Sequence, residues 1–448
     1  MEEIPTTRYM KNKVFFWSIT VALGGFLFGF DTAVISGAEQ SIQQYWQLNG
    51  FEHGLTVSIA LIGTIIGSML GSLPSEKLGR KKTLILIAVL YLFSSLGTAL
   101  ATGWPVFLLF RFLGGIGVGA SSVTAPIYIS EISPAASRGK LVALFQFNIV
   151  LGILISYLSN YLIGQESDSS WRWMMGVQAF PSLLFLVLLR FVPESPRWLI
   201  LRKGQIAEAT ETLKVINPGG YEAELRAIRN DVQSEHQSEA LFSRKNRFPV
   251  FLAITFAVFN QVSGINAIIY YAPRIFEMTG LGKQSSLLSS VGIGFVNFLF
   301  TLLALSFIDR VGRRTLMLIG SLGLIITLGL VSRAFYLNEF NGFMVTVFLL
   351  VYIAFFAFSQ GAVIWVFISE IFPNQVRAKG QTLGSMTHWV MAALIAFIFP
   401  MLTESLGGGN TFLFFCVMMV LQLLFVWKIM PETKGKSLEQ LEGTLIMH

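Results

Sequence analysis

Asp31 is the residue whose position most constrains the chemistry of this chain. It stands in an otherwise uncharged run from Val14 to Ala38, which is long enough to cross a bilayer. A carboxylate inside a bilayer-length helix costs about 2.5–3.5 kcal/mol by insertion scales, and it usually faces a partner or a water-filled path. Asp31 therefore indicates a proton site or a substrate site.

Arg111 is the cation that could pair with Asp31. It lies well inside a later apolar segment that begins near Trp104. At about 1.5 Å per residue, Arg111 and Asp31 would both lie roughly 10 Å below the same membrane surface. We expect the two side chains to form an ion pair that protonation of Asp31 would break. The alternative is a permanent pair that only fixes two helices.

The composition identifies the class of protein that surrounds this pair. Of the 448 residues, 54% are hydrophobic and 13% are charged, whereas about a quarter of a soluble protein is charged. Apolar runs of spanning length start near positions 14, 54, 83, 104, 141, 173, 249, 285, 315, 343, 380 and 410. We predict an all-α integral membrane protein with twelve transmembrane helices. An enzyme is not expected, because no polar domain is large enough to hold an active site.

The distribution of the basic residues predicts the orientation in the bilayer. All but five of the 32 Lys and Arg fall in or beside segments on one side, if the N-terminus is cytoplasmic. The exceptions are Arg111, Arg172, Arg274, Lys283 and Arg333. The net charge of +7 is therefore explained by topology rather than by binding of nucleic acid. Both termini should be cytoplasmic, and the first apolar run should remain as a helix rather than be cleaved as a signal.

Cofactor and metal sites are not expected. Cys416 is the single cysteine, and four scattered histidines, His53, His236, His388 and His448, offer no metal-binding spacing. The glycine-rich run Gly114–Gly119 resembles a nucleotide loop only superficially. It lies inside a predicted membrane helix, where small residues permit close helix contact.

Three motifs recur between the two halves of the chain. Ser130–Lys140 returns as Ser369–Lys379, Glu76–Lys81 as Asp309–Arg314, and Pro193–Ser195 as Pro431–Thr433, all at nearly the same offset. Such a duplication is typical of transporters built from two parallel repeats with the substrate between them. We predict a six-helix half at 1–192, a linker with short cytoplasmic helices at 193–248, a second six-helix half at 249–430 and a cytoplasmic tail at 431–448.

The motifs together resemble the sugar porter family of the major facilitator superfamily, which holds xylose-proton symporters and glucose facilitators. The resemblance runs over essentially the whole chain. Its marks are Gly79–Lys81, Pro193–Trp198, Gln261–Asn266 followed by Tyr270–Pro273, Gly312–Arg314 and Pro431–Gly435. In that family the acid at the position of Asp31 is associated with proton coupling, and Arg111 is its expected partner.

The resemblance also implies a sugar site made of amides and aromatic rings. A neutral sugar needs side chains that both donate and accept hydrogen bonds, with flat rings for its C–H faces. The positions implied are Gln146, Asn260, Gln261, Asn266, Tyr271, Asn297, Trp365 and His388. The spacing of Gln261 and Asn266 requires an unwound helix or a broad site. Without the resemblance, each amide could equally form an interhelical hydrogen bond.

Two positions depart from the family pattern. Ala362 stands where many relatives have the proline that interrupts the tenth span, so this span lacks the residue that forms the family's gating hinge. His388 precedes Trp389 where relatives usually carry Gln or Asn. A histidine there could bond a sugar hydroxyl, or it could be a buried neutral side chain bonded to a neighbouring helix.

Charged residues at cytoplasmic helix ends form the last predicted group. In the family they make ion-pair networks that brace the outward-facing state, so that opening inward must break them. The corresponding residues here are Arg80, Glu131, Arg138, Arg313, Glu370 and Arg377. The arginines could also serve topology alone, but the glutamates could not, since acids contribute little to topology.

We therefore expect a secondary active transporter that imports a monosaccharide, hexose or pentose, with a proton by alternating access. The alternatives are a proton-independent sugar or polyol facilitator and a non-transporting sugar receptor. We expect a multi-pass monomer in the lipid bilayer of the cell inner (plasma) membrane. The sequence does not identify the sugar.

Overall fold

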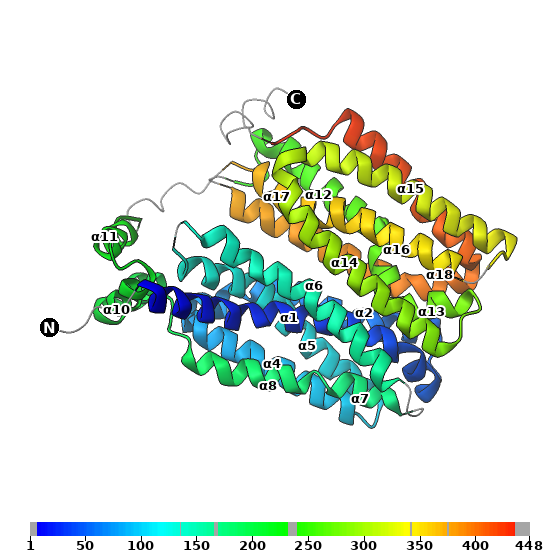
Figure 1. Cartoon of the computed structure of the whole chain (residues 1–448), viewed down its shortest axis with the longest axis horizontal. Helices are drawn as coiled ribbons and strands as arrows, with labels where there is room; N and C mark the ends of the chain where they lie inside the picture. The colour runs from blue at the N-terminus through cyan, green and yellow to red at the C-terminus, as the bar shows by residue number, and fades with distance from the viewer. Residues whose placement is uncertain are drawn as a thin grey trace. The chain divides into compact units, whose positions relative to one another are not determined.

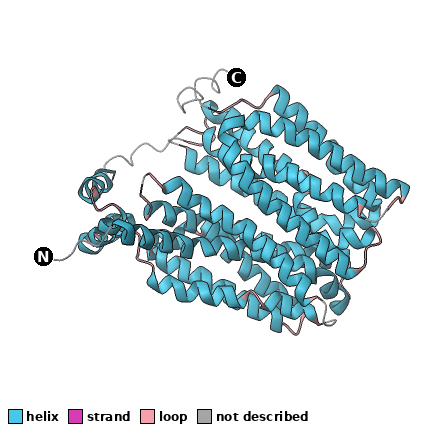
Figure 2. Cartoon of the chain, viewed as in Figure 1, coloured by secondary structure: helices cyan, strands magenta, loops and turns pink. Residues whose placement is uncertain are grey.

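The computed structural model is helical throughout the part that it describes, which comprises residues 7–134, 136–164, 169–231, 240–340, 343–373 and 376–434. No strand occurs in these ranges (Figure 2). Residues 232–239 of the predicted linker and 435–448 of the predicted tail lie outside the described residues.

The helices follow the apolar runs of the sequence, and Figure 1 labels most of them along the chain. In the N-terminal part the order is α1 (Thr7–Trp46), α2 (Gly50–Leu70), α3 (Ser72–Leu78), α4 (Arg80–Leu100), α5 (Trp104–Glu131), α6 (Arg138–Ile163), α7 (Ser170–Gly176), α8 (Ala179–Leu188) and η1 (Leu189–Phe191). The linker contains α9 (Pro196–Trp198), η2 (Leu199–Lys203), α10 (Ile206–Ile216), α11 (Tyr221–Asp231) and η3 (Arg244–Asn246). The C-terminal part contains α12 (Arg247–Val262), α13 (Ile265–Met278), α14 (Lys283–Val311), α15 (Arg313–Leu337), α16 (Met344–Phe356), η4 (Ala357–Gly361), α17 (Ala362–Glu370) and α18 (Arg377–Lys428).

The described residues contain 11 helical stretches that are long and apolar enough to cross a membrane. One of them, α18, has 52 residues and contains Gly407 in a non-helical conformation, with φ 76° and ψ 163°. Since roughly 20 residues suffice for one crossing, α18 supplies two spans that meet at Gly407. The predicted all-α fold with twelve spans is therefore confirmed. The short helices expected in the linker are also present.

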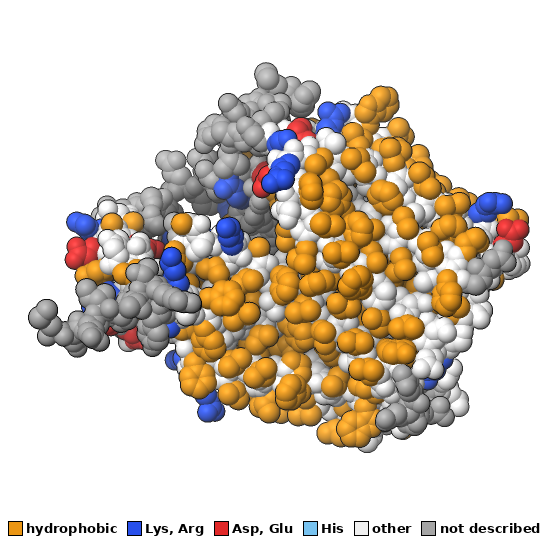
Figure 3. Space-filling view, in the orientation of Figure 1, with side chains coloured by type: hydrophobic (Ala, Val, Ile, Leu, Met, Phe, Trp, Pro, Cys, Tyr) orange, Lys and Arg blue, Asp and Glu red, His pale blue; other side chains and the backbone are white. Residues whose placement is uncertain are grey.

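The outward surfaces of the helices are apolar. Large hydrophobic side chains such as Phe295, Leu322 and Ile326 are exposed. Figure 3 shows hydrophobic side chains spread over the helices on the visible face, with most of the charged side chains toward its edges. Exposed apolar surface on this scale is stable only where lipid replaces water.

The chain divides into two compact units. Unit 1 comprises Met1–Thr32, Gly63–Ile153 and Met175–Gln237, and unit 2 comprises Ala33–Ile62, Leu154–Met174 and Ser238–His448. These units do not coincide with the predicted six-helix halves, because the ends of α1, α2 and α6 group with the C-terminal helices. The division into halves at 192 and 249 stays a prediction from the repeat.

Close helix contacts in unit 1 explain several of its glycines. A Cβ atom at Gly29 of α1 would lie 1.9 Å from the carbonyl oxygen of Ile149 in α6. In the Gly114–Gly119 run, a Cβ atom at Gly119 would lie 2.2 Å from the carbonyl oxygen of Thr64 in α2. The run therefore serves helix packing, as expected for small residues in a membrane helix.

The seventh span is interrupted in unit 2, between α12 and α13. Gly264 has φ 86°, and Ser263 and Gly264 separate the two helices. A Cβ atom at Gly264 would lie 2.6 Å from the ring of Phe415. Both the backbone and the packing thus require glycine here. The unwinding that the spacing of Gln261 and Asn266 called for is present.

The tenth span is also interrupted, although it lacks the proline that the family often uses. Ala357–Gly361 form a π-helical segment, η4, directly before Ala362 and α17. A π-bulge leaves the backbone hydrogen-bond pattern irregular and often marks a functional site. This segment interrupts the regular helix directly before Ala362 without a proline.

Gly264→Ala should destabilise the fold more than Gly280→Ala. Both glycines have φ 86°, but a Cβ atom at Gly280 would meet nothing within 4 Å. The backbone penalty alone is about 1–2 kcal/mol, and overpacking against Phe415 brings the total at Gly264 to about 2–5 kcal/mol. Thermal unfolding in detergent measures the difference. Equal melting temperatures for the two variants would show that Phe415 moves aside at no cost.

Candidate functional site

Asp31 and Arg111 meet in the interior of unit 1. Asp31 lies on α1 and Arg111 on α5, and the Nη1 atom of Arg111 donates a 2.8 Å hydrogen bond to Oδ1 of Asp31. Their side chains are 4% and 1% exposed, respectively. The pairing predicted from depth is thus present, although α1 continues to Trp46, beyond the expected end of the first span at Ala38.

This ion pair is bonded at one point rather than two. Nε and Nη2 of Arg111 are buried without a hydrogen-bond partner among the described residues. Because buried donors without partners are costly, the pair is not arranged for maximal stability. Such a pair can be separated at lower cost than a bidentate one.

The amides at the break of the seventh span form one polar network in unit 2. Nδ2 of Asn266 donates to Oε1 of Gln261 at 2.6 Å, and Nε2 of Gln261 donates to Oδ1 of Asn260 at 2.9 Å. Asn260 in turn donates to the carbonyl oxygen of Gln360, at 3.4 Å, in the π-helical segment. Interruption of the helix at Gly264 brings Gln261 and Asn266 into direct contact despite their spacing.

His388 and Trp365 extend this network with two aromatic rings. Nε2 of Gln261 lies 3.2 Å from Nδ1 and 3.3 Å from Nε2 of His388, on α18. The ring of His388 is 4.9 Å from that of Trp365, which remains 38% exposed. The structure therefore joins the histidine to the amides and to a partly exposed indole, which is the combination that a polyhydroxylated ligand requires.

The remaining predicted sugar-site residues are placed differently. Tyr271 is fully buried, and its hydroxyl donates to the carbonyl oxygen of Ala396 at 2.8 Å, so that it joins α13 to α18. Asn297, on α14, is half-buried and has no hydrogen bond to the network among the described residues. Gln146 is half-buried on α6 and belongs to unit 1.

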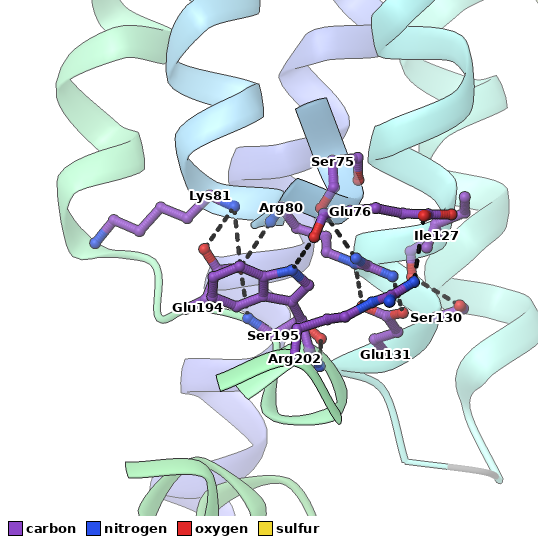
Figure 4. Close-up of polar contacts among 11 residues, drawn as sticks. Ser75, Glu76, Arg80, Lys81, Ile127, Ser130, Glu131, Glu194, Ser195 and Arg202 are labelled. Carbon is purple, nitrogen blue, oxygen red and sulfur yellow. Dashed lines mark hydrogen bonds and ion pairs between the residues drawn. The ribbon is translucent and has the colours of Figure 1, made fainter. Parts of the chain in front are cut away.

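A charged cluster joins the ends of α4 and α5 in unit 1 (Figure 4). Nε and Nη2 of Arg80 each donate to Glu131 at 2.9 Å, and Nη1 donates to the carbonyl oxygen of Ser75 at 3.0 Å. The Glu194 carboxylate accepts from the backbone N–H groups of Arg80 and Lys81 at the start of α4. A carboxylate at a helix N-terminus is favoured by the helix dipole as well as by these donors.

The same cluster is repeated in unit 2. Nε and Nη2 of Arg313 donate to Glu370 at 3.2 and 2.7 Å, and Nη1 donates to the carbonyl oxygen of Ile308. Glu432 accepts from the backbone N–H groups of Arg313 and Arg314. The repeat seen in the sequence is therefore also a repeat of the main contacts, including the carbonyl oxygen that accepts the third guanidinium hydrogen bond. The second cluster has two further contacts, from Arg313 to Asp309 and from Thr433 to Glu370.

Two of the six predicted network residues lie outside these clusters. Arg138 is exposed, and Nε of Arg377 donates to the carbonyl oxygen of Phe372 at 3.4 Å rather than to a glutamate. Glu194 and Glu432, in contrast, were not predicted, although their Pro-Glu-Ser and Pro-Glu-Thr motifs were identified as repeats. Burial raises the pKa of the Glu194 carboxyl, while the N–H groups of Ser195, Lys81 and Arg80 oppose this by stabilising its ionised form.

Sequence reasoning also missed a buried charge cluster in unit 2. The Glu39 carboxylate accepts from Nε and Nη2 of Arg274 at 2.9 and 2.8 Å, and it lies 2.7 Å from Nε2 of His53. Arg274 had been noted only as an exception to the charge distribution, and His53 only as a histidine without metal spacing. The sequence does contain one signal for this cluster. Glu39 is an acid directly after the run Val14 to Ala38, and it would need a partner in a neighbouring helix.

Comparison with known proteins identifies the family. The profile described as "Sugar (and other) transporter" matches residues 17–445. The chain belongs to this family of sugar transporters. Its relatives include the arabinose-proton symporter of Bacillus subtilis, 37% identical over 98% of this chain and 97% of the relative, and the D-xylose-proton symporter of Escherichia coli K12, 37% identical over 98% and 96%. The glucose transport protein of Synechocystis is 38% identical over 94% and 95%.

The fold of this sugar transporter agrees with solved structures. The inward open conformation of the xylose transporter XylE from E. coli has a TM-score of 0.86 at 34% identity, covering 96% of this chain and 99% of that one. Its partially occluded inward open conformation has a TM-score of 0.85 at 34% identity, covering 95% and 100%. The resemblance inferred from the motifs is thereby confirmed.

Arg80→Lys should destabilise the transporter more than Arg202→Lys. Lysine keeps the charge but cannot reproduce the three guanidinium hydrogen bonds of Arg80, whose side chain is only 15% exposed. We expect a loss of about 2–4 kcal/mol. Arg202 pairs with Glu76 with both side chains more than half exposed, and its replacement should cost about 0–1 kcal/mol. Thermal unfolding compares them; an Arg80 variant as stable as the Arg202 variant would contradict a bracing role.

Proposed function

We propose that this protein imports a monosaccharide, hexose or pentose, together with a proton by alternating access. The observation that carries the proposal is the buried, singly bonded Asp31–Arg111 pair within a chain whose relatives include arabinose-proton and xylose-proton symporters. An acid buried in a membrane helix is a candidate proton site, because keeping its charge inside the bilayer costs free energy. The incomplete bonding of Arg111 favours a pair that separates during function.

Protonation acts by removing the negative charge of Asp31. Protonated Asp31 no longer compensates Arg111, and a buried guanidinium without a counter-charge is strongly unfavourable. Conformations in which Arg111 reaches water or another acceptor therefore gain in population relative to the paired state. Proton binding at Asp31 is in this way coupled to a change of conformation. The direct pair of the structure corresponds to the deprotonated carboxylate.

The sugar is bound in part by the network around Gln261. Asn260, Gln261 and Asn266 supply donors and acceptors that already orient one another, which lowers the cost of ordering them around a ligand. His388 adds a ring nitrogen, and the exposed part of Trp365 adds a flat apolar surface. Gln146 and Asn297 are retained as proposed contacts because of the family resemblance. Tyr271 is proposed to support the site through its bond to α18.

The proposed setting is the cell inner (plasma) membrane, with both termini cytoplasmic and the protein acting as a monomer. The orientation is supported by the positive-inside distribution of Lys and Arg. In this orientation the two repeated clusters lie on the cytoplasmic side. The hydrogen bonds of the first cluster fall within unit 1, and those of the second fall within unit 2. This supports a role in which each cluster braces the helices of its own half, so that the half moves as one body during transport.

Asp31→Asn should abolish uphill accumulation of sugar while leaving exchange of sugar across the membrane measurable. Asparagine is uncharged at every pH, so it can neither release a proton nor restore the ion pair. Proteoliposomes with an imposed proton gradient and a panel of radiolabelled hexoses and pentoses test this. Glu208→Gln is the control, because Glu208 is an exposed acid on the linker helix α10 whose loss should leave accumulation intact. Full accumulation by the Asp31 variant would refute the coupling, and gradient-independent uptake by the parent protein would identify a facilitator.

His388→Gln should change the order in which sugars are preferred. A ring nitrogen that pairs with one hydroxyl discriminates epimers, because the wrong epimer leaves it unpaired. Glutamine restores the residue type common in relatives, and it can still bond Gln261. Competition uptake with epimeric monosaccharides measures the order. An unchanged order in a well-folded variant would assign His388 to packing and leave specificity to Trp365 and the amides.

A further inference from the structure

The structure contains a second buried acid that the proposed transport mechanism does not use. Glu39 and His53 are 0% exposed, and the side chain of Arg274 is 20% exposed. We refer to Glu39, Gln43, His53 and Arg274 as the Glu39 cluster. All four residues belong to unit 2, where they join three helices: Glu39 and Gln43 on α1, His53 on α2 and Arg274 on α13.

The bonding within the Glu39 cluster is dense. The guanidinium of Arg274 donates to both oxygens of Glu39 and, through Nη2, to Oε1 of Gln43 at 2.5 Å. The 2.7 Å contact between Nε2 of His53 and Oε2 of Glu39 requires a proton on that nitrogen. The carboxylate thus accepts three hydrogen bonds from two side chains. This is the bidentate arrangement that the Asp31–Arg111 pair lacks.

The cluster has no net charge only while His53 is neutral. Nδ1 of His53 is buried without a partner among the described residues, so a second ring proton would become an unpaired buried donor. It would also add a positive charge beside Arg274. A proton on Glu39 instead would leave Arg274 uncompensated. Binding of one proton at either residue therefore weakens the contact among the three helices.

Other charged groups act electrostatically on the Glu39 cluster. Glu404 on α18 acts on Arg274, and Glu277 on α13 interacts with both Arg274 and Glu39. Further titratable groups around the cluster are Glu52 on α2, Tyr157 on α6, Tyr270 and Tyr271 on α13, and Lys283 on α14. Among the described residues, none of these is a hydrogen-bond partner of the Glu39 carboxylate.

The helix that carries Arg274 is irregular. α13 follows the break at Gly264, and Tyr271 within it has the non-helical values φ −120° and ψ 20°, two residues before Pro273. Two further contacts lie nearby in unit 2: Tyr157 of α6 donates to the carbonyl oxygen of Ile269 in α13, and the ring of Phe51 in α2 is 5.2 Å from that of Phe397 in α18. The Glu39 cluster supplies the ionic contact between α1 and α13, so separation of these two helices requires that contact to break.

We propose that Glu39 and His53 form a second proton-binding site, distinct from Asp31, that controls separation of α1 and α2 from Arg274 on α13. This proposal rests on the proposed function in one respect: it uses the proposed membrane orientation, in which the Glu39 cluster lies at the external side. A proton from outside would release these helix ends and admit sugar, so that the driving ion also opens the entrance. The closed form binds fewer protons than the open form; acid therefore favours opening, and alkali favours closure.

Accessibility of a single cysteine tests the proposal without sugar or a gradient. In a Cys416→Ser background, Ser36→Cys places a thiol at a fully buried site on α1, one turn before Glu39. A membrane-impermeant maleimide added outside should react slowly at about pH 7.5 and roughly tenfold faster at about pH 5.5, the range in which histidine changes charge. Each rate is divided by that of an exposed Gln284→Cys reference, which cancels the effect of pH on thiol reactivity.

Three variants decide the outcome. Glu39→Gln should label rapidly at both pH values, and His53→Gln should lose most of the pH dependence. Arg274→Lys, which keeps the charge but not the bidentate contact, should label at an intermediate rate even if the first two fold poorly. Glu52→Gln is the matched control: Glu52 caps the first turn of α2 beside His53, and its variant should retain both the slow rate and the pH response.

The results also separate this proposal from the proposed function. Slow labelling of Glu39→Gln, or an undiminished pH response in His53→Gln, would overturn the second proton site and leave Asp31 coupling intact. Labelling only from the opposite side of the membrane would overturn the proposed orientation. A pH response in a protein that fails to accumulate sugar would refute proton-driven import while supporting the site.

Discussion

An arginine keeps its charge at every physiological pH, so an arginine that is paired with a carboxylate away from water depends on that carboxylate remaining ionised. Arg80, Arg111, Arg274 and Arg313 are all paired in this way. In a low-dielectric interior the loss of one partner costs more than the intact pair contributes. The number of hydrogen bonds that each arginine makes is the basis on which we assign it a bracing role or a role in a pair that separates. Arg80 and Arg313 make three side-chain bonds each, whereas Arg111 makes one.

The number of hydrogen bonds distinguishes the repeated clusters from the Asp31–Arg111 pair, although all of them are arginine–carboxylate pairs. The repeated clusters use a guanidinium, a glutamate and a carbonyl to join helix ends, and a second glutamate to hold the following helix N-terminus. Nothing in either cluster is left unpaired to favour another arrangement. Arg111, by contrast, retains two buried nitrogens that any competing acceptor would stabilise. The same chemistry thus gives a fully bonded guanidinium at the helix ends and an incompletely bonded one in the membrane interior.

The fold and the principal ion pair could be predicted from the sequence because they depend on strong, local signals. Apolar run lengths gave the spans, and the cost of an isolated acid implied a partner at the depth of Arg111. The Glu39 cluster could not be found in this way, since Glu39, His53 and Arg274 come from three helices and none is conspicuous in its own segment. The hydrogen bond from the Tyr271 hydroxyl to the carbonyl oxygen of Ala396 could not be predicted either, because it joins α13 to α18 at a residue with non-helical backbone angles. The π-helical segment before Ala362 has no counterpart in a simple residue pattern.

The two acids of α1 are bonded to different extents. Asp31 accepts one hydrogen bond from Arg111, whereas the Glu39 carboxylate accepts three, two of them from a bidentate arginine. The mechanism that we propose assigns them different roles. The sparser pair couples the bound proton to transport, because it loses little bonding when it separates, and the denser cluster holds the helix ends together until a proton is bound.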